Sequence, residues 1–127
     1  MPAMTKALLG REEVALRWRL ALADYIRDAR VDAGLTQAEL ADRLDLNSKQ
    51  FVSGIETGRT SVPPERLEAF AEALGIDKVD FAKTVLRYSN PWMFAAIFGA
   101  DKKLREELAN TPDRVNTRRG PRLPSDR

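Results

Sequence analysis

Cysteine and histidine are both absent from the 127 residues of this sequence. Their absence excludes zinc fingers, disulfide scaffolds, thiol redox chemistry and nucleophiles activated by histidine. Long apolar runs are missing too, since none approaches the roughly 20 residues that a membrane span needs. Residues 1–10 also lack the basic start and apolar stretch of a signal peptide. We therefore expect a soluble cytoplasmic protein with no membrane partner, no metal site and no cofactor.

Catalytic patterns are absent as well. Serine, threonine, lysine and carboxylates occur, but no arrangement places a nucleophile beside a base, and there is no glycine-rich phosphate loop or cluster of metal ligands. The sequence therefore predicts a protein that is not an enzyme, and no pocket for a small-molecule effector is expected in so short a chain.

The composition is that of one folded domain with additions at its ends. Hydrophobic residues make up 43% of the chain, which is enough for a single core. The net charge of +2 is unevenly spread: residues 34–75 carry seven acidic and four basic side chains, whereas residues 111–127 carry five arginines and two aspartates. Because residues 111–127 offer little to bury, we expect a disordered basic tail, either a solvated end or an arm that reaches for phosphates.

The periodicity of the middle of the chain is helical throughout. From Val14 to Leu108 apolar residues recur at helical spacing and strand alternation is absent, so the predicted fold class is all-α. The first stripe, which contains Val14, Trp18 and Leu22, predicts a helix that starts as early as Glu12. In order, we expect helices over residues 12–33, 37–44, 49–57, 63–74, 77–88, 90–98 and 100–108.

Two of these helices are short and adjacent. Thr36 and Glu39 have the spacing of a capping box at the start of the second helix, and Asn47–Ser48 can cap the third. In the third helix Val52 and Ile55 are expected to point inward. That leaves an outer face made of Lys49, Gln50, Ser53 and Gly54.

Residues 36–57 thus form a predicted helix-turn-helix, in which the second short helix can enter the major groove of DNA. We expect four segments: a flexible N-terminus (1–10), a five-helix repressor-like domain (11–88), an apolar helical extension (89–110) and the disordered tail (111–127). The stretches Gly34–Ala41 and Phe51–Gly58 resemble the Cro and phage-repressor, or Xre, family of DNA-binding regulators over residues 22–75. The resemblance implies double-stranded DNA as the partner and a bacterial or phage protein that is associated with the nucleoid when bound.

The resemblance also implies functions for individual side chains. Lys49 and Gln50 correspond to base readers, and lysine can donate to guanine while glutamine pairs with adenine. Arg30 and Glu56 correspond to an ion pair that joins the third helix to the first. Phe51 is open between packing on a neighbouring helix and contact with a thymine methyl. The expected base contacts are made by Lys49, Gln50 and Ser53, and the expected phosphate contacts by Gln37, Ser48, Arg59 and Thr60.

Departures from the family pattern occur in and after the turn. Asp45 stands where the family usually has glycine, and aspartate enters the left-handed region more readily than most residues. Gly54 stands where many relatives place a third base reader. The segment between Leu44 and Glu56 is one residue longer than in the commonest version, so the turn is expected to differ locally.

A single short recognition helix reads few base pairs, so such regulators usually act as dimers on symmetric sites. The predicted homodimer or partner interface is the apolar set Trp92, Phe94, Ile97 and Phe98, which alternatively caps the core. Val14 and Trp18 are a second candidate interface. The sequence therefore predicts a transcriptional regulator, most simply a repressor on an inverted-repeat operator. The alternative is an antitoxin-like module whose helix-turn-helix regulates its own operon and whose C-terminal helix binds a protein partner.

Overall fold

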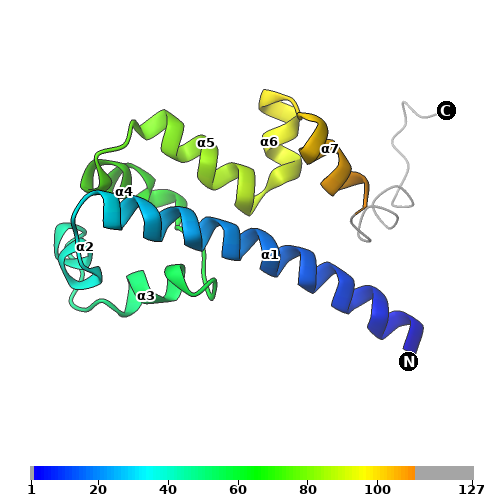
Figure 1. The fold of residues 1–127 in the computed structure, drawn as a ribbon, viewed down its shortest axis with the longest axis horizontal. Helices are drawn as coiled ribbons and strands as arrows, with labels where there is room; N and C mark the ends of the chain where they lie inside the picture. The colour runs from blue at the N-terminus through cyan, green and yellow to red at the C-terminus, as the bar shows by residue number, and fades with distance from the viewer. Residues whose placement is uncertain (1, 111–127) are drawn as a thin grey trace.

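The computed structural model describes the backbone of residues 2–110 and the side chains of residues 13–110. Within these residues all regular structure is helical, which confirms the predicted all-α class (Figure 1). The elements in chain order are α1 (Pro2–Asp32), α2 (Gln37–Arg43), α3 (Gln50–Glu56), a 3-10 turn η1 (Pro64–Arg66), α4 (Leu67–Leu74), α5 (Lys78–Ser89), α6 (Pro91–Phe98) and α7 (Lys102–Ala109).

Short polar side chains start most of the shorter helices. Thr36 Oγ1 accepts from the Glu39 N–H at 3.0 Å, and the Glu39 carboxylate accepts from the Thr36 N–H at 2.9 Å, so the predicted capping box is present. The side chains of Asp77, Asn90 and Asp101 accept hydrogen bonds from backbone N–H groups at the starts of α5, α6 and α7. These caps satisfy backbone donors that a helix leaves without intrahelical partners.

Helix α1 runs through the middle of the molecule, with α3 on one side and α5 on the other (Figure 1). The first core cluster lies where α1 to α5 meet, and its largest fully buried side chains include Phe70, Phe81, Leu22, Ile26 and Leu40. The rings of Phe70 and Phe81 stack with centroids 6.2 Å apart. This cluster holds α3 at a fixed angle to α1, because Val52 and Ile55 are both buried in it.

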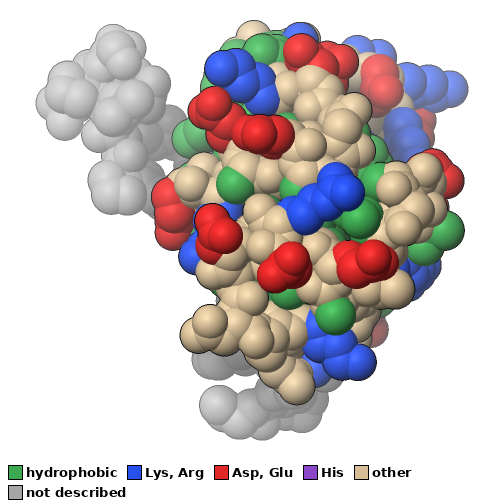
Figure 2. All heavy atoms as spheres, turned by 90° about the vertical axis from the view of Figure 1, so that its left-hand side faces the viewer, with side chains coloured by type: hydrophobic (Ala, Val, Ile, Leu, Met, Phe, Trp, Pro, Cys, Tyr) green, Lys and Arg blue, Asp and Glu red, His purple; other side chains and the backbone are tan. Residues whose placement is uncertain are grey.

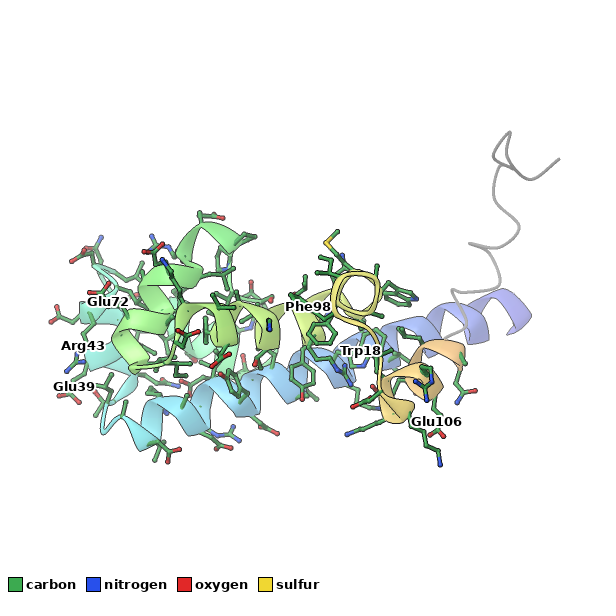
Figure 3. All side chains as sticks on the ribbon, turned by 90° about the horizontal axis from the view of Figure 1, so that it is seen from above. Trp18, Glu39, Arg43, Glu72, Phe98 and Glu106 are labelled. Carbon is green, nitrogen blue, oxygen red and sulfur yellow. The ribbon has the colours of Figure 1, made fainter. Side chains whose placement is uncertain are left out.

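A second core cluster joins α1 to the C-terminal helices. Trp18 is 6% exposed and packs with Leu104 and Leu108 of α7, and half-buried Phe94 of α6 completes the contact. The Trp92 ring meets Trp18 edge to face at a centroid distance of 5.4 Å. Figure 3 shows Trp18 on the side of α1 that faces α6 and α7, far from Glu39 and Arg43 at the α2 end.

Three expectations from the sequence need correction. Helix α1 begins at Pro2 rather than near Glu12, so the segment 1–10 expected to be flexible has helical backbone from residue 2 on. The cap of the third helix differs in position: Lys49 occupies the N-cap without a side-chain cap, although Ser48 Oγ accepts from the Gln50 N–H at 3.4 Å. Trp18 is covered by α7 of the same chain, so it is not a free dimer surface. The predicted tail, 111–127, lies outside the described residues.

Candidate functional site

The Glu56 carboxylate connects the C-terminal end of α3 to α1 and α2. Glu56 accepts from Arg30 Nε at 2.7 Å and from Arg30 Nη2 at 3.0 Å, so the ion pair is bidentate. Gln37 Nε2, at the start of α2, donates to the same carboxylate at 3.1 Å. Arg30 Nη1 donates to the Leu35 carbonyl at 2.7 Å, which adds the connection before α2. The two helices of the motif are therefore clamped to α1 at one point.

This clamp is largely shielded from water. The side chains of Arg30 and Glu56 are 13% and 3% exposed. Hydrogen bonding to Glu56 raises the pKa of the Arg30 guanidinium, while burial opposes this shift and the charge of Glu56 adds to it. Arginine is the side chain that can satisfy a buried carboxylate with two parallel N–H donors.

The turn between α2 and α3 uses a left-handed residue. Asp45 has φ of +58°, and among the described non-glycine residues it alone has positive φ. The turn is fastened to the following helices, since Arg66 Nη1 donates to the Leu44 carbonyl at 3.2 Å. The Arg66 guanidinium also lies 5.6 Å from the centroid of the Phe51 ring, which is itself 6.3 Å from the ring of Phe70. Phe51 therefore packs against neighbouring helices, which is the first of the two functions that the sequence left open for it.

Fewer residues of the third helix are exposed on its outer face than the sequence predicts. Lys49 and Gln50 are exposed and Ser53 is half-buried. Gly54 is buried, so its expected outward position is wrong: a Cβ at this residue would lie 3.3 Å from Thr60 Cγ2. The exposed Ser48 hydroxyl accepts from the Gln50 N–H at 3.4 Å. The readable surface is thus concentrated at the N-terminal end of α3.

The segment after α3 folds back onto the buried glycine. The N–H groups of Arg59 and Thr60 both donate to the Gly54 carbonyl, at 3.0 and 3.3 Å. Arg19 Nε of α1 donates to the Gly58 carbonyl at 2.9 Å. The exposed side chains of Arg59 and Thr60 therefore start from a fixed backbone.

Sequence reasoning missed two arginines that hold this site. Arg19 fixes the segment after α3, and Arg66 fixes the turn before it. Both donate to backbone carbonyls far away in the sequence, and a carbonyl acceptor leaves no residue-type signal. Only the tertiary structure identifies them.

The surface around the motif carries mixed charge. Figure 2 shows acidic side chains spread over the end of the molecule where α2 lies, with basic side chains between them. Among the described residues no group of acidic side chains could hold a metal ion. In the same part of the chain, no helix has the length and apolarity needed to cross a membrane.

Comparison with protein families matches residues 21–83 to a family described as a helix-turn-helix domain. The matched segment contains the clamp, the turn, α3 and the segment after it. No curated protein and no solved structure matches the chain.

Proposed function

The chain belongs to the helix-turn-helix family of DNA-binding regulators through residues 21–83, and from this premise we propose that it represses transcription by placing α3 in the major groove of an operator. The supporting observation is that α3 has a buried, fixed inner face and an exposed N-terminal end. Its inner face is buried in the first core cluster and its exit is clamped by Arg30, whereas Lys49 and Gln50 at its entry are exposed. A rigid helix that presents donors at one end suits base recognition.

In this proposal Lys49, Gln50 and Ser53 contact bases. Lysine donates to guanine, glutamine pairs with adenine through two hydrogen bonds, and the half-buried Ser53 reaches only an edge that approaches closely. The buried Gly54 faces Thr60 rather than the outer surface, so it takes no part in the base contacts.

The phosphate contacts flank α3 on both sides. Gln37 uses one amide N–H on Glu56 and retains a second for a phosphate oxygen. Ser48 stands before α3, and Arg59 and Thr60 stand after it on the backbone held by Gly54. Because residues 34–75 are acidic overall, few cations supply the electrostatic attraction, and specificity depends on these positions.

We further propose that two copies bind an inverted repeat. Helix α6 leaves Trp92, Ile97 and Phe98 40%, 60% and 47% exposed, and Val79 of α5 beside them is 54% exposed. A groove of about 490 Å³ lies between α4, α5 and α6. Phe94 is half-buried in the second core cluster and caps the core instead.

The charges along this groove favour a second copy as its occupant. Glu65 and Glu68 line the groove from the α4 side, and Lys78 and Lys83 line it from the α5 side. Within the chain Lys78 Nζ lies 3.9 Å from Glu68 Oε1, an exposed pair, so Glu65 and Lys83 are the charges left for a second copy. A two-fold axis brings the acidic side of one copy opposite the basic side of the other, as an isologous interface requires. An exposed apolar face rimmed by charge is typical of an interaction surface.

The first experiment is selection of bound duplexes from a random pool at near-physiological salt. We expect an inverted repeat with half-sites about one helical turn apart. Gln50→Ala should relax preference at one base pair and cost about 1 to 3 kcal/mol there. Equal loss of binding on all sequences would refute base reading by Gln50.

Arg59→Ala tests the phosphate contacts separately. It should weaken binding to every duplex and reduce the salt slope by about one. Lys103→Ala removes the same charge from an exposed position on α7 and serves as the control, with the slope unchanged. An equal slope change in both variants would mean that Arg59 acts only through net charge.

The dimer is tested by Ile97→Asp, which places a charge in the groove without touching α3. We expect a monomer in sedimentation and selection of single half-sites. A wild-type protein that is monomeric at tens of micromolar, with α6 exposed, would instead favour the antitoxin-like alternative, in which this face binds another protein.

A further inference from the structure

A second hollow, separate from the dimer groove, opens between α5, α6 and α7. It has a volume of about 610 Å³, which lies within the range of pockets that hold small organic molecules. Phe98 and Lys83 separate it from the groove, since both residues line the two spaces.

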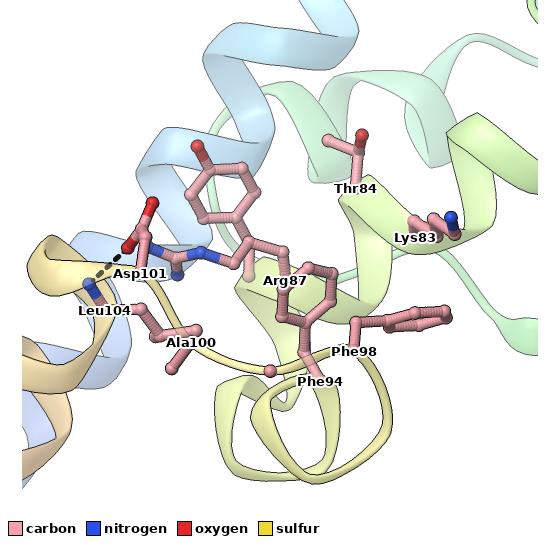
Figure 4. A pocket seen from close by; sticks show the side chains of 10 residues that line it. Lys83, Thr84, Arg87, Phe94, Phe98, Ala100, Asp101 and Leu104 are labelled. Atoms are coloured by element: carbon pink, nitrogen blue, oxygen red, sulfur yellow. Dashed lines mark hydrogen bonds between the residues drawn. The ribbon is translucent and has the colours of Figure 1, made fainter.

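The walls of this hollow are aromatic. Phe94 and Phe98 of α6 stand with ring centroids 5.2 Å apart at an interplanar angle of 45° (Figure 4). Tyr88 of α5 and Leu104 of α7 line the hollow from the other helices. Such walls favour a flat apolar body over a sugar or a free phosphate.

One edge of the hollow is cationic. Lys83 Nζ lies 4.8 Å from the centroid of the Phe98 ring, and among the described residues no carboxylate lies within ion-pair distance of it. Arg87, one helical turn further along α5, donates through Nη2 to Glu107 at 2.8 Å. Within the described residues of one chain, Lys83 is therefore the cation at this edge that has no carboxylate partner.

Arg87, which lines the hollow, carries a donor without an acceptor. Its buried Nη1 has no hydrogen-bond partner among the described residues. Buried donors are nearly always paired in folded proteins, and leaving one without an acceptor is costly. Thr84 does not offer a donor to a ligand, because its hydroxyl already donates to the Asp80 carbonyl at 3.0 Å.

The acid on the opposite wall is already engaged. Asp101 Oδ1 accepts from the Leu104 N–H at 2.8 Å as the cap of α7. Figure 4 shows Asp101 and Lys83 on opposite sides of the hollow. A ligand with one anionic end can place it beside Lys83 and keep its apolar end among the rings, away from this carboxylate.

We propose that the hollow binds a small aromatic carboxylate, with its ring between Phe94, Phe98 and Tyr88 and its carboxylate on Lys83. The hollow lies outside the helix-turn-helix, since every residue that lines it belongs to α5, α6, α7 or the segment between α6 and α7. No residue of the helix-turn-helix lines it.

The test is calorimetric titration of the full chain with 2-naphthoate and with its neutral analogue 2-naphthamide. We expect naphthoate to bind at least about tenfold more tightly than the amide, because only the anion gains a charge-assisted hydrogen bond. Lys83→Met retains an apolar stem against Phe98 and should weaken naphthoate to the level of the amide. Lys83→Arg should restore most of the binding.

Lys78→Met is the matched control, since this exposed lysine of α5 lines only the dimer groove. It should leave naphthoate binding unchanged. Equal affinities for acid and amide, no loss in Lys83→Met, or absence of binding at millimolar naphthoate would each overturn the proposal. Loss of binding in Ile97→Asp but not in Lys83→Met would place the ligand in the groove and overturn it as well.

Discussion

Removing one member of the Arg30–Glu56 pair should destabilise the protein far more than removing both. Arg30→Met leaves a carboxylate whose side chain is 3% exposed with Gln37 as its remaining side-chain donor. Breaking a buried ion pair from one side costs about 3 to 5 kcal/mol, whereas replacing both members by apolar residues is often nearly neutral. The double variant Arg30→Met/Glu56→Leu should therefore be more stable than Arg30→Met alone.

The other single variant should be milder. Glu56→Leu leaves Arg30, which is 13% exposed and keeps its bond to the Leu35 carbonyl. We expect a cost toward the lower end, about 2 to 3 kcal/mol, because water reaches part of the guanidinium. For a domain of this size, a loss of about 3 kcal/mol lowers Tm by roughly 12 to 24 °C.

The assay is urea unfolding at pH 7, followed by far-ultraviolet circular dichroism for the four proteins of the cycle. Because the double variant is expected to be nearly neutral, the interaction free energy between the two sites should approach the sum of the two single costs, about 5 kcal/mol or more. Additive costs would refute the reasoning, because they would mean that the pair has no mutual stabilisation. The guanidinium is not the source of any acid sensitivity: its raised pKa means that its contribution is complete below the unfolded value and is lost only as pH rises through the folded one.

Three further predictions concern other parts of the fold. Gly58→Ala should cost slightly more than Gly34→Ala. Both glycines have positive φ, but at Gly58 a Cβ would also lie 2.8 Å from Cδ2 of the exposed Leu20, whose side chain must shift; thermal unfolding of the two variants checks this. Hydrogen bonds from Thr36 lower the pKa of Glu39 below its value in the unfolded chain, about 4.3. The difference in stability between wild type and Glu39→Gln should therefore be present above the unfolded pKa and vanish as the pH falls through the folded pKa. Thermal melts from about pH 2 to 7 measure this difference. Leu104→Ala should lower the free energy of unfolding by about 2 to 5 kcal/mol, and circular dichroism should show α6 and α7 loosening before the first core cluster unfolds.

Local signals in the sequence were enough for the fold class and for the helix starts that depend on neighbours. The capping box of Thr36 and Glu39 involves residues three apart, so it can be recognised without tertiary structure. The stripe through Leu22 and Ile26 likewise predicts which face of α1 is buried. Family comparison agrees with the resemblance drawn from residues 34–41 and 51–58.

What the sequence could not provide depends on distant contacts. The inward position of Gly54 follows from the segment that folds back over it, and nothing in the helical spacing indicates that segment's path. The burial of Trp18 depends on α7, which lies at the other end of the domain in sequence. The aromatic hollow forms only where three helices meet, so no single stretch of the sequence predicts it.

Helix α1 connects the two core clusters. Trp18 belongs to the second cluster and Leu22 to the first, and they are four residues apart on one unbroken helix. Inserting a single residue between them would turn Trp18 by about 100° around α1 relative to Leu22 and move it by about 1.5 Å along the axis. Helices α6 and α7 would not follow, because Tyr88 of α5 packs on both clusters and Arg87 of α5 pairs with Glu107 of α7. The register of α1 is therefore fixed at both ends, and an insertion would separate Trp18 from Leu104 and Leu108.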